Sequence, residues 1–187
     1  LAPEGLRRPS DYVADVTRMF WPSQDEHQGY TVPYAKLGRK LLFRCAEMTL
    51  WCGASGSGKS QILSDCLVDW VKQGSRVCLC SLEMKPQQTL KRMVKQVVGA
   101  DRPTEHAIVR ALEWLDEGLL MYERVGKAGI NSLLEIFAFA HAKYGCDQFV
   151  VDSLMRLGIE SDDYSGQERA VFEMVDWTIA HQVHLHL

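Results

Sequence analysis

The chain has 187 residues, of which 47% are hydrophobic and 24% are charged, and its formal net charge is −3. This length suits one domain with a substantial buried core and is too short for two large domains. The net charge excludes nucleic-acid binding through bulk positive charge, so any such contact needs a local patch or a pore built by several subunits. The sequence contains no apolar signal peptide and no segment as long as a membrane span, so we expect a cytoplasmic protein.

The six cysteines form no CxxC pair, and several of them lie inside apolar runs. They are Cys45, Cys52, Cys66, Cys78, Cys80 and Cys146. This pattern predicts reduced thiols in the core of an intracellular protein.

The first 34 residues are predicted to form a linker with one short helix. Residues 1–10 contain Pro3, Gly5, Arg7, Arg8 and Pro9, and Ser10 is a suitable N-cap for a helix over residues 11–20. The apolar residues of that helix make a single stripe, which could pack on its own domain or on a neighbouring molecule. Residues 21–34 carry turn formers and are predicted to be a loop.

Strand and helix patterns alternate from residue 35 onward, so we place one domain over residues 35–187. A buried strand is predicted over residues 47–52, followed by a glycine-rich loop and a helix over residues 59–73. A second strand is predicted over residues 76–82. Pro86 suits the first turn of the next helix, which is expected to reach about residue 98.

The remaining sequence continues this alternation. Further helices are predicted over residues 104–114, 131–143 and 168–181. Further strands are predicted over residues 119–123, 148–152 and 183–187. Asn131 or Ser132 is the expected cap of its helix, and a largely polar loop is expected over residues 158–166. Apolar strands that alternate with helices predict an α/β fold with a mainly parallel sheet covered on both faces. Because a strand pattern is still running at Leu187, we expect the chain to be part of a longer protein, truncated at its C-terminus.

The glycine-rich loop matches the pattern G-x-x-x-x-G-K-[ST] of a P-loop. Its residues are Gly53, Ala54, Ser55, Gly56, Ser57, Gly58, Lys59 and Ser60. The glycines allow successive backbone N–H groups to point at phosphate oxygens, and Lys59 brings a positive charge to the β- and γ-phosphates. The Ser60 hydroxyl is a ligand for Mg²⁺, and the following helix presents its N-terminus to the anion. A hydrophobic strand before the loop and a helix after it argue against a chance glycine loop. The sequence therefore predicts binding of ATP or another nucleoside triphosphate together with Mg²⁺.

Two carboxylates are candidates for roles in Mg²⁺ binding and in hydrolysis of that nucleotide. Asp152 ends an apolar strand downstream of the P-loop and is predicted to order the Mg²⁺ shell, the alternative being a simple cap after a core strand. Glu83 follows the second strand, and C-terminal strand ends face the nucleotide in such sheets. Glu83 is therefore a candidate general base that polarises the attacking water, although an ordinary exposed loop glutamate explains its position equally well.

The segment Cys80-Ser-Leu-Glu-Met84, followed by Arg92, resembles a motif of the DnaB-like replicative helicases. These proteins belong to the RecA-like ATPases, and phage primase–helicases and the mitochondrial Twinkle helicase are relatives. The strand and P-loop over residues 47–60 and the strand that ends at Asp152 also resemble those of the family. The likeness spans about residues 45–187, with three motifs in the family's order.

This resemblance implies a RecA-like P-loop NTPase that works as the motor of a replicative DNA helicase. Such proteins form rings, usually hexameric, that couple NTP hydrolysis to translocation on single-stranded DNA and to duplex unwinding. By resemblance, Lys59 and Ser60 bind phosphate and Mg²⁺, Asp152 supports Mg²⁺, Glu83 activates water, and Arg92 is a structural or sensor position. The compartment implied is the cytoplasm of a bacterial or phage-infected cell.

The resemblance also bears on the parts of the chain outside these motifs. The loop after Asp152 resembles the family's first DNA-facing loop, and the helix over residues 11–20 lies where the family has a linker helix that docks on the adjacent subunit. The family's polar sensor, arginine finger and second DNA loop would lie beyond Leu187. We therefore expect this chain alone to have weak or no ATPase activity.

Two alternative hypotheses remain. One is a RecA-like ATPase that acts as a regulatory switch without unwinding DNA, and the other is a nucleotide-binding module of a recombination protein. A P-loop kinase is a more distant alternative, because no arginine-rich lid is evident. His184 and His186 share one face of the last predicted strand, and we interpret them as strand residues without a metal.

Overall fold

A single parallel sheet of five strands organises the computed structural model, which describes residues 7–21, 28–38, 40–82, 84–123, 129–153, 159 and 162–187. The strands are β1 (Glu47–Thr49), β2 (Val77–Ser81), β3 (Leu119–Tyr122), β4 (Gln148–Asp152) and β5 (His184–His186). Their order across the sheet is β1-β5-β4-β2-β3, and every neighbouring pair is parallel. All the strands therefore end at the same edge of the sheet, which is the edge that binds ligands in open α/β folds.

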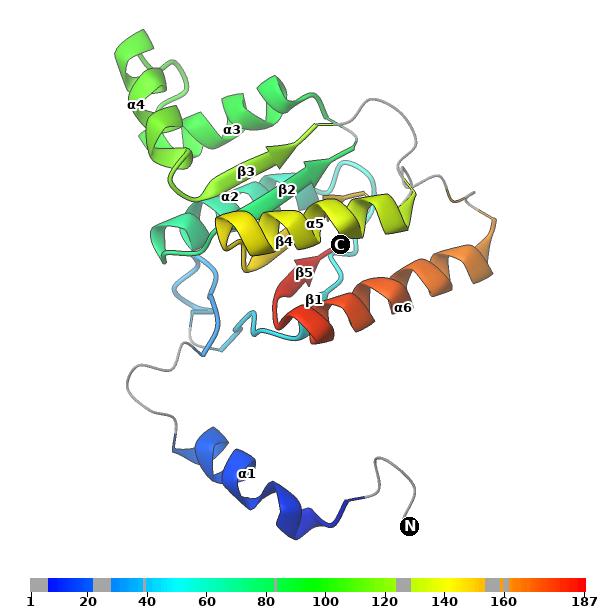
Figure 1. Ribbon diagram of the computed structural model, residues 1–187. Helices are drawn as coiled ribbons and strands as arrows, with labels where there is room; N and C mark the ends of the chain where they lie inside the picture. The colour runs from blue at the N-terminus through cyan, green and yellow to red at the C-terminus, as the bar shows by residue number, and fades with distance from the viewer. Residues whose placement is uncertain are drawn as a thin grey trace.

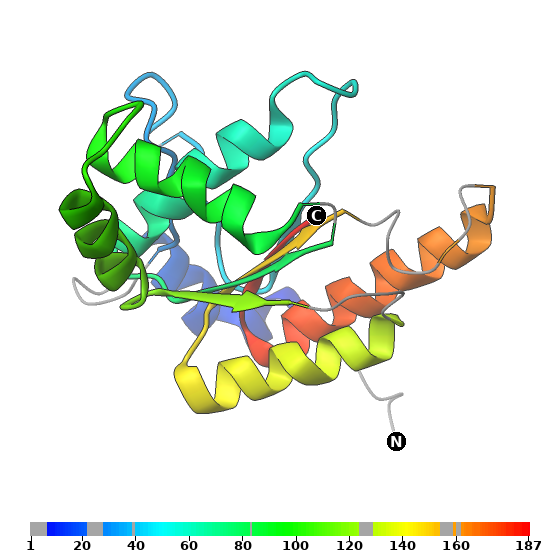
Figure 2. The same ribbon diagram turned by 90° about the horizontal axis from the view of Figure 1, so that it is seen from above.

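Helices cover both faces of the sheet, as Figure 2 shows from above. The helices are α1 (Val13–Phe20), α2 (Lys59–Lys72), α3 (Pro86–Val98), α4 (Glu105–Leu115), α5 (Ile130–Tyr144) and α6 (Tyr164–His181). One core cluster joins α2, α3 and α4 to the sheet, with Trp70 and Met93 fully buried in it. The other joins α5 and α6 to the opposite face, with Phe137 and Phe149 fully buried. Alternate residues of β2 point to the two clusters, as the period of a strand requires.

The predicted helices and strands are all present, with differences at their ends. The expected caps of α5 are wrong: Gly129 is the N-cap, and Asn131 and Ser132 lie inside the first turn. The loop predicted to reach Gly166 ends earlier, because the Asp163 side chain accepts a hydrogen bond from the Gly166 N–H (2.9 Å) and starts α6 at Tyr164. Ser165 and Gly166 are weak helix formers, and the tertiary structure overrides their local preference.

The N-terminal helix lies apart from the sheet (Figure 1). A 3₁₀ turn over Pro9–Tyr12 precedes α1 and contains Ser10. The prediction that Ser10 caps the helix is therefore wrong. No residue of α1 is buried, and Met19 and Phe20 are 83% and 76% exposed. The apolar stripe predicted from the sequence exists, but it does not pack on this domain.

The segment before β1 contributes side chains to the core. Tyr30 pairs with Phe43 in an isolated antiparallel bridge, and both side chains are buried together with Val32. The Phe43 ring lies edge-on against Trp70, with the ring centroids 5.1 Å apart. The core thus includes the side chains of Tyr30 and Val32, although both residues lie in the segment that is predicted to be a loop.

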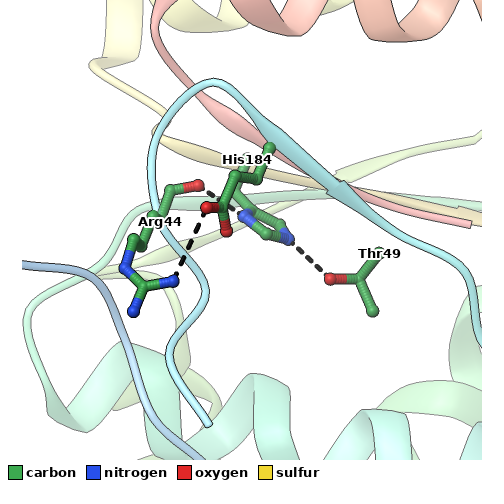
Figure 3. A network of polar contacts seen from close by, with 4 residues as sticks. Arg44, Thr49 and His184 are labelled. Carbon is green, nitrogen blue, oxygen red and sulfur yellow. Dashed lines mark hydrogen bonds and ion pairs between the residues drawn. The ribbon is translucent and has the colours of Figure 1, made fainter.

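Two buried histidines lie side by side on β5, on the same face as predicted. The His184 Nδ1 donates to the backbone oxygen of Arg44 (2.6 Å), and its Nε2 is 2.9 Å from the Thr49 hydroxyl (Figure 3). The His186 Nε2 is 2.6 Å from the Gln148 Oε1, and its Nδ1 accepts from the Trp51 indole N–H (3.3 Å). Both imidazoles are therefore integrated into a buried polar network that links β5 to its two neighbouring strands.

Four of the six cysteines are core thiols as predicted, namely Cys66, Cys78, Cys80 and Cys146, and burial raises the pKa of each. The prediction is wrong for Cys45 and Cys52, which are exposed. Both lie in the connections that flank the short strand β1, where the chain runs over the surface.

The helices that the structure describes lack the combination of length and apolar character that crossing a membrane would require.

Candidate nucleotide-binding site

The loop between β1 and α2 has the backbone that a phosphate cradle needs. Gly56 and Gly58 have φ angles of 73° and 91°, a region that residues with a Cβ atom rarely adopt. A Cβ on Gly53 would lie 2.9 Å from the Ser57 hydroxyl oxygen, so a larger residue there would require the Ser57 side chain to move. The conformation of the loop thus explains why glycine stands at positions 56 and 58.

Lys59 starts α2 and folds back over the loop. Its Nζ donates to the backbone oxygens of Gly53 (2.7 Å) and Ala54 (3.0 Å). Gly58 is the N-cap of α2 and has no side chain that could cap the first turn. The ammonium group and the first N–H groups of the helix therefore both face the region in front of the loop, and each favours an anion there.

A hollow of about 930 Å³, called here the P-loop hollow, opens in front of this loop. Its lining residues come from the P-loop, the start of α2, α3 and the end of β4. They are Ser55, Gly56, Ser57, Gly58, Lys59, Ser60, Gln61, Arg92, Asp152 and Ser153. Of the predicted site residues, Lys59, Ser60, Asp152 and Arg92 are thus brought together at one hollow, although they are far apart in the sequence.

Asp152 reaches the hollow because β4 ends beside β2, with Asp152 opposite Ser81 in the register. The Leu82 N–H donates to the Asp152 backbone oxygen (2.7 Å), which fixes the ends of the two strands together. Asp152 and Ser60 line the same hollow, and hard oxygen ligands such as a carboxylate and a hydroxyl are those that Mg²⁺ prefers. The residues present therefore fit a magnesium ion held beside a phosphate chain.

Glu83, the predicted general base, lies outside the described residues. Its described neighbours Leu82 and Met84 follow the end of β2, at the same edge of the sheet as Asp152. The predicted DNA-facing loop after Asp152 also falls largely outside the described residues.

Arg92 approaches the P-loop hollow from α3. Its Nη2 donates to the Met84 sulfur at 3.4 Å, so the segment after β2 orients the guanidinium. Sequence reasoning missed Gln61 and Ser153 as lining residues. Each directly follows a predicted site residue, Ser60 or Asp152, and this adjacency is the signal that could have identified them.

Comparisons with known proteins agree with this geometry. A family model described as an AAA domain matches residues 31–187. One solved structure of an ATPase domain superposes with a TM-score of 0.77 at 15% identity, covering 95% of this chain and 69% of that one. A DnaB-like replicative helicase, solved in a study of its interactions with primase, superposes with a TM-score of 0.75 at 14% identity, covering 96% of this chain and 48% of that one.

At these identities the superpositions establish the fold, and a search of curated protein sequences gave no match. The RecA-like α/β fold predicted from the resemblance to DnaB-like helicases is confirmed. The family match covers most of the chain, including the P-loop, α3 and β4. The chain belongs to the AAA domain family.

Proposed function

We propose that this chain is the ATP-binding motor domain of a replicative DNA helicase, which couples NTP hydrolysis to translocation on single-stranded DNA. The observation that carries the proposal is the P-loop hollow, where Lys59, Ser60, Asp152 and Arg92 meet at the ligand-binding edge of a RecA-like sheet. The segment over residues 80–84 and Arg92, which resemble a motif of the DnaB-like helicases, favour a helicase over other P-loop ATPases.

In this proposal the loop from Gly53 to Ser60 wraps the phosphate chain with its backbone N–H groups. Lys59 leaves its contacts with the loop's own carbonyl oxygens and pairs with the β- and γ-phosphates. Ser60 and Asp152 would hold Mg²⁺, which neutralises charge on the phosphate oxygens when bound. Glu83 would orient and deprotonate the attacking water, and Arg92 would sense the terminal phosphate from α3.

We propose further that the functional unit is a ring of several copies, joined in part by α1. An apolar groove of about 350 Å³ lies between α3 and α4 and is lined by Leu90, Val94, Ile108 and Leu112 among others. The exposed stripe of α1 and the groove are both apolar, so α1 of one copy would dock on the groove of the next.

Substituting Phe20 by aspartate is expected to weaken self-association of this chain, because a charge would have to enter the apolar groove. Light scattering over a concentration series, with Mg²⁺ and a non-hydrolysable ATP analogue, measures the effect. Thr17→Asp adds the same charge to an exposed polar position of the same helix and should leave assembly unchanged. Equal assembly of the two variants would contradict docking through the stripe.

Single-stranded DNA is expected to stimulate ATP hydrolysis by this protein in its assembled form. Glu83→Gln should lower the hydrolysis rate by about 100-fold or more while ATP still binds, since it removes the general base and keeps the phosphate contacts. The exposed Glu117→Gln is the matched control. If DNA does not change the rate of ATP hydrolysis, the protein is instead a RecA-like ATPase with a regulatory or recombination role.

A further inference from the structure

A second hollow, about 460 Å³ in volume, adjoins the P-loop hollow, and we call it the basic hollow. It lies between the start of α2 and the length of α3. Its lining residues are Gln61, Gln88, Lys91, Arg92, Lys95, Gln96 and Asp101. Gln61 and Arg92 line both hollows, so the two share a wall.

The basic hollow concentrates positive charge on a chain whose net charge is negative. Three cations line it against one carboxylate, Asp101. Asp101 pairs with Lys95 at 3.1 Å, but its side chain is 96% exposed, and a pair so open to water compensates little charge. Within the described part of the chain, no carboxylate lies within salt-bridge distance of Lys91 or Arg92. Positive charge therefore remains available to an anion.

The uncharged lining favours a phosphate group over a stacked base. No aromatic side chain is among the described residues that line the hollow, whereas single-stranded nucleic acids are usually held by bases stacked on aromatic rings. The Gln96 amide donates to the Gln61 backbone oxygen (3.2 Å), which fixes α3 against α2. Lysines and glutamine amides are donors that suit phosphoryl oxygens.

We propose that the basic hollow is a second anion site, which holds a phosphate group of a ligand other than the nucleotide in the P-loop. Lys91 and Lys95 would supply its charge. Arg92 stands between the two sites, so the two ligands would compete for its guanidinium. The proposal goes beyond the helicase function and does not require it.

Inorganic pyrophosphate is a suitable probe when the P-loop is disabled by Lys59→Ala. Titration calorimetry should detect pyrophosphate binding that remains in this variant. Adding Lys91→Gln and Lys95→Gln should weaken that binding by about tenfold or more, because two charge-assisted contacts are lost. The matched control adds Lys36→Gln and Lys72→Gln instead, which remove the same charge from exposed positions elsewhere, and binding should stay as in Lys59→Ala.

Equal pyrophosphate affinity with and without Lys91 and Lys95, in variants of unchanged thermal stability, would overturn the proposal. So would the complete loss of binding in Lys59→Ala alone, because the P-loop would then be the sole anion site. The outcome is separate from the proposed motor function, which fails instead if the unmodified chain does not bind an ATP analogue.

A short oligothymidylate, added in competition with pyrophosphate, identifies the source of the phosphate group. Displacement of pyrophosphate from the basic hollow assigns the site to a nucleic-acid backbone. Retention of pyrophosphate assigns it to a small phosphorylated ligand.

Discussion

Replacing Lys59 by alanine is expected to lower the affinity of this chain for Mg²⁺–ATP by about tenfold or more, because the charge-assisted contact with the β- and γ-phosphates is lost. The fold should survive, since the Lys59 side chain bonds only to the exposed loop carbonyls of Gly53 and Ala54 among the described residues. Binding of a fluorescent ATP analogue, followed by anisotropy, measures the change directly and does not require hydrolysis.

A matched control exists in the same helix. Lys72 lies in the last turn of α2, at the end remote from the P-loop, and is exposed. Lys72→Ala removes the same charge and should leave ATP binding unchanged. If the two alanine variants bind the analogue equally well, the loop does not cradle phosphate, and the site assignment fails with it.

Acidification from about pH 7.5 to about pH 5 is expected to destabilise the fold through the two histidines of β5. Burial lowers the pKa of His184 and lowers that of His186 further, well below the ordinary histidine value of 6.5. In this window the unfolded chain binds protons that the folded chain does not. Stability is therefore full above about pH 6.5 and falls by about 1.4 kcal/mol per pH unit for each histidine that stays neutral in the folded state.

The hydrogen bonds explain why His186 resists protonation. The Trp51 indole can only donate, so the His186 Nδ1 must keep its lone pair, and Nε2 carries the proton that goes to the Gln148 Oε1. A second proton would face the Trp51 N–H group. His184 differs, because the Thr49 hydroxyl near its Nε2 can either donate or accept.

Urea unfolding over a pH series tests this assignment. His186→Gln keeps a polar side chain but cannot titrate, so the slope of stability against pH should become shallower by about 1.4 kcal/mol per pH unit. His106→Gln, at an exposed position of α4, should keep the original slope. A slope that His186→Gln leaves unchanged would show that the carboxylates, and not this histidine, govern the acid sensitivity.

The sequence by itself determined the parts of this protein that rest on local chemistry. The P-loop could be recognised because its left-handed backbone at Gly56 and Gly58 demands glycine, and because a strand and a helix flank it. The limits of β4 were predicted correctly at Asp152, since an apolar run that ends in a carboxylate leaves little ambiguity. The alternation of strands and helices likewise indicated the parallel α/β fold.

Only the tertiary structure decided the relations between distant segments. It inserted β5 between β1 and β4, and thereby buried His184 and His186 among partners from other strands. It left α1 exposed and the thiols of Cys45 and Cys52 outside the core, although their sequence patterns also suit burial. It also placed Arg92 at the boundary of two hollows. Burial and the neighbours of a strand depend on contacts between segments that are far apart in the sequence. The residue pattern of one segment does not indicate which other segment it packs against.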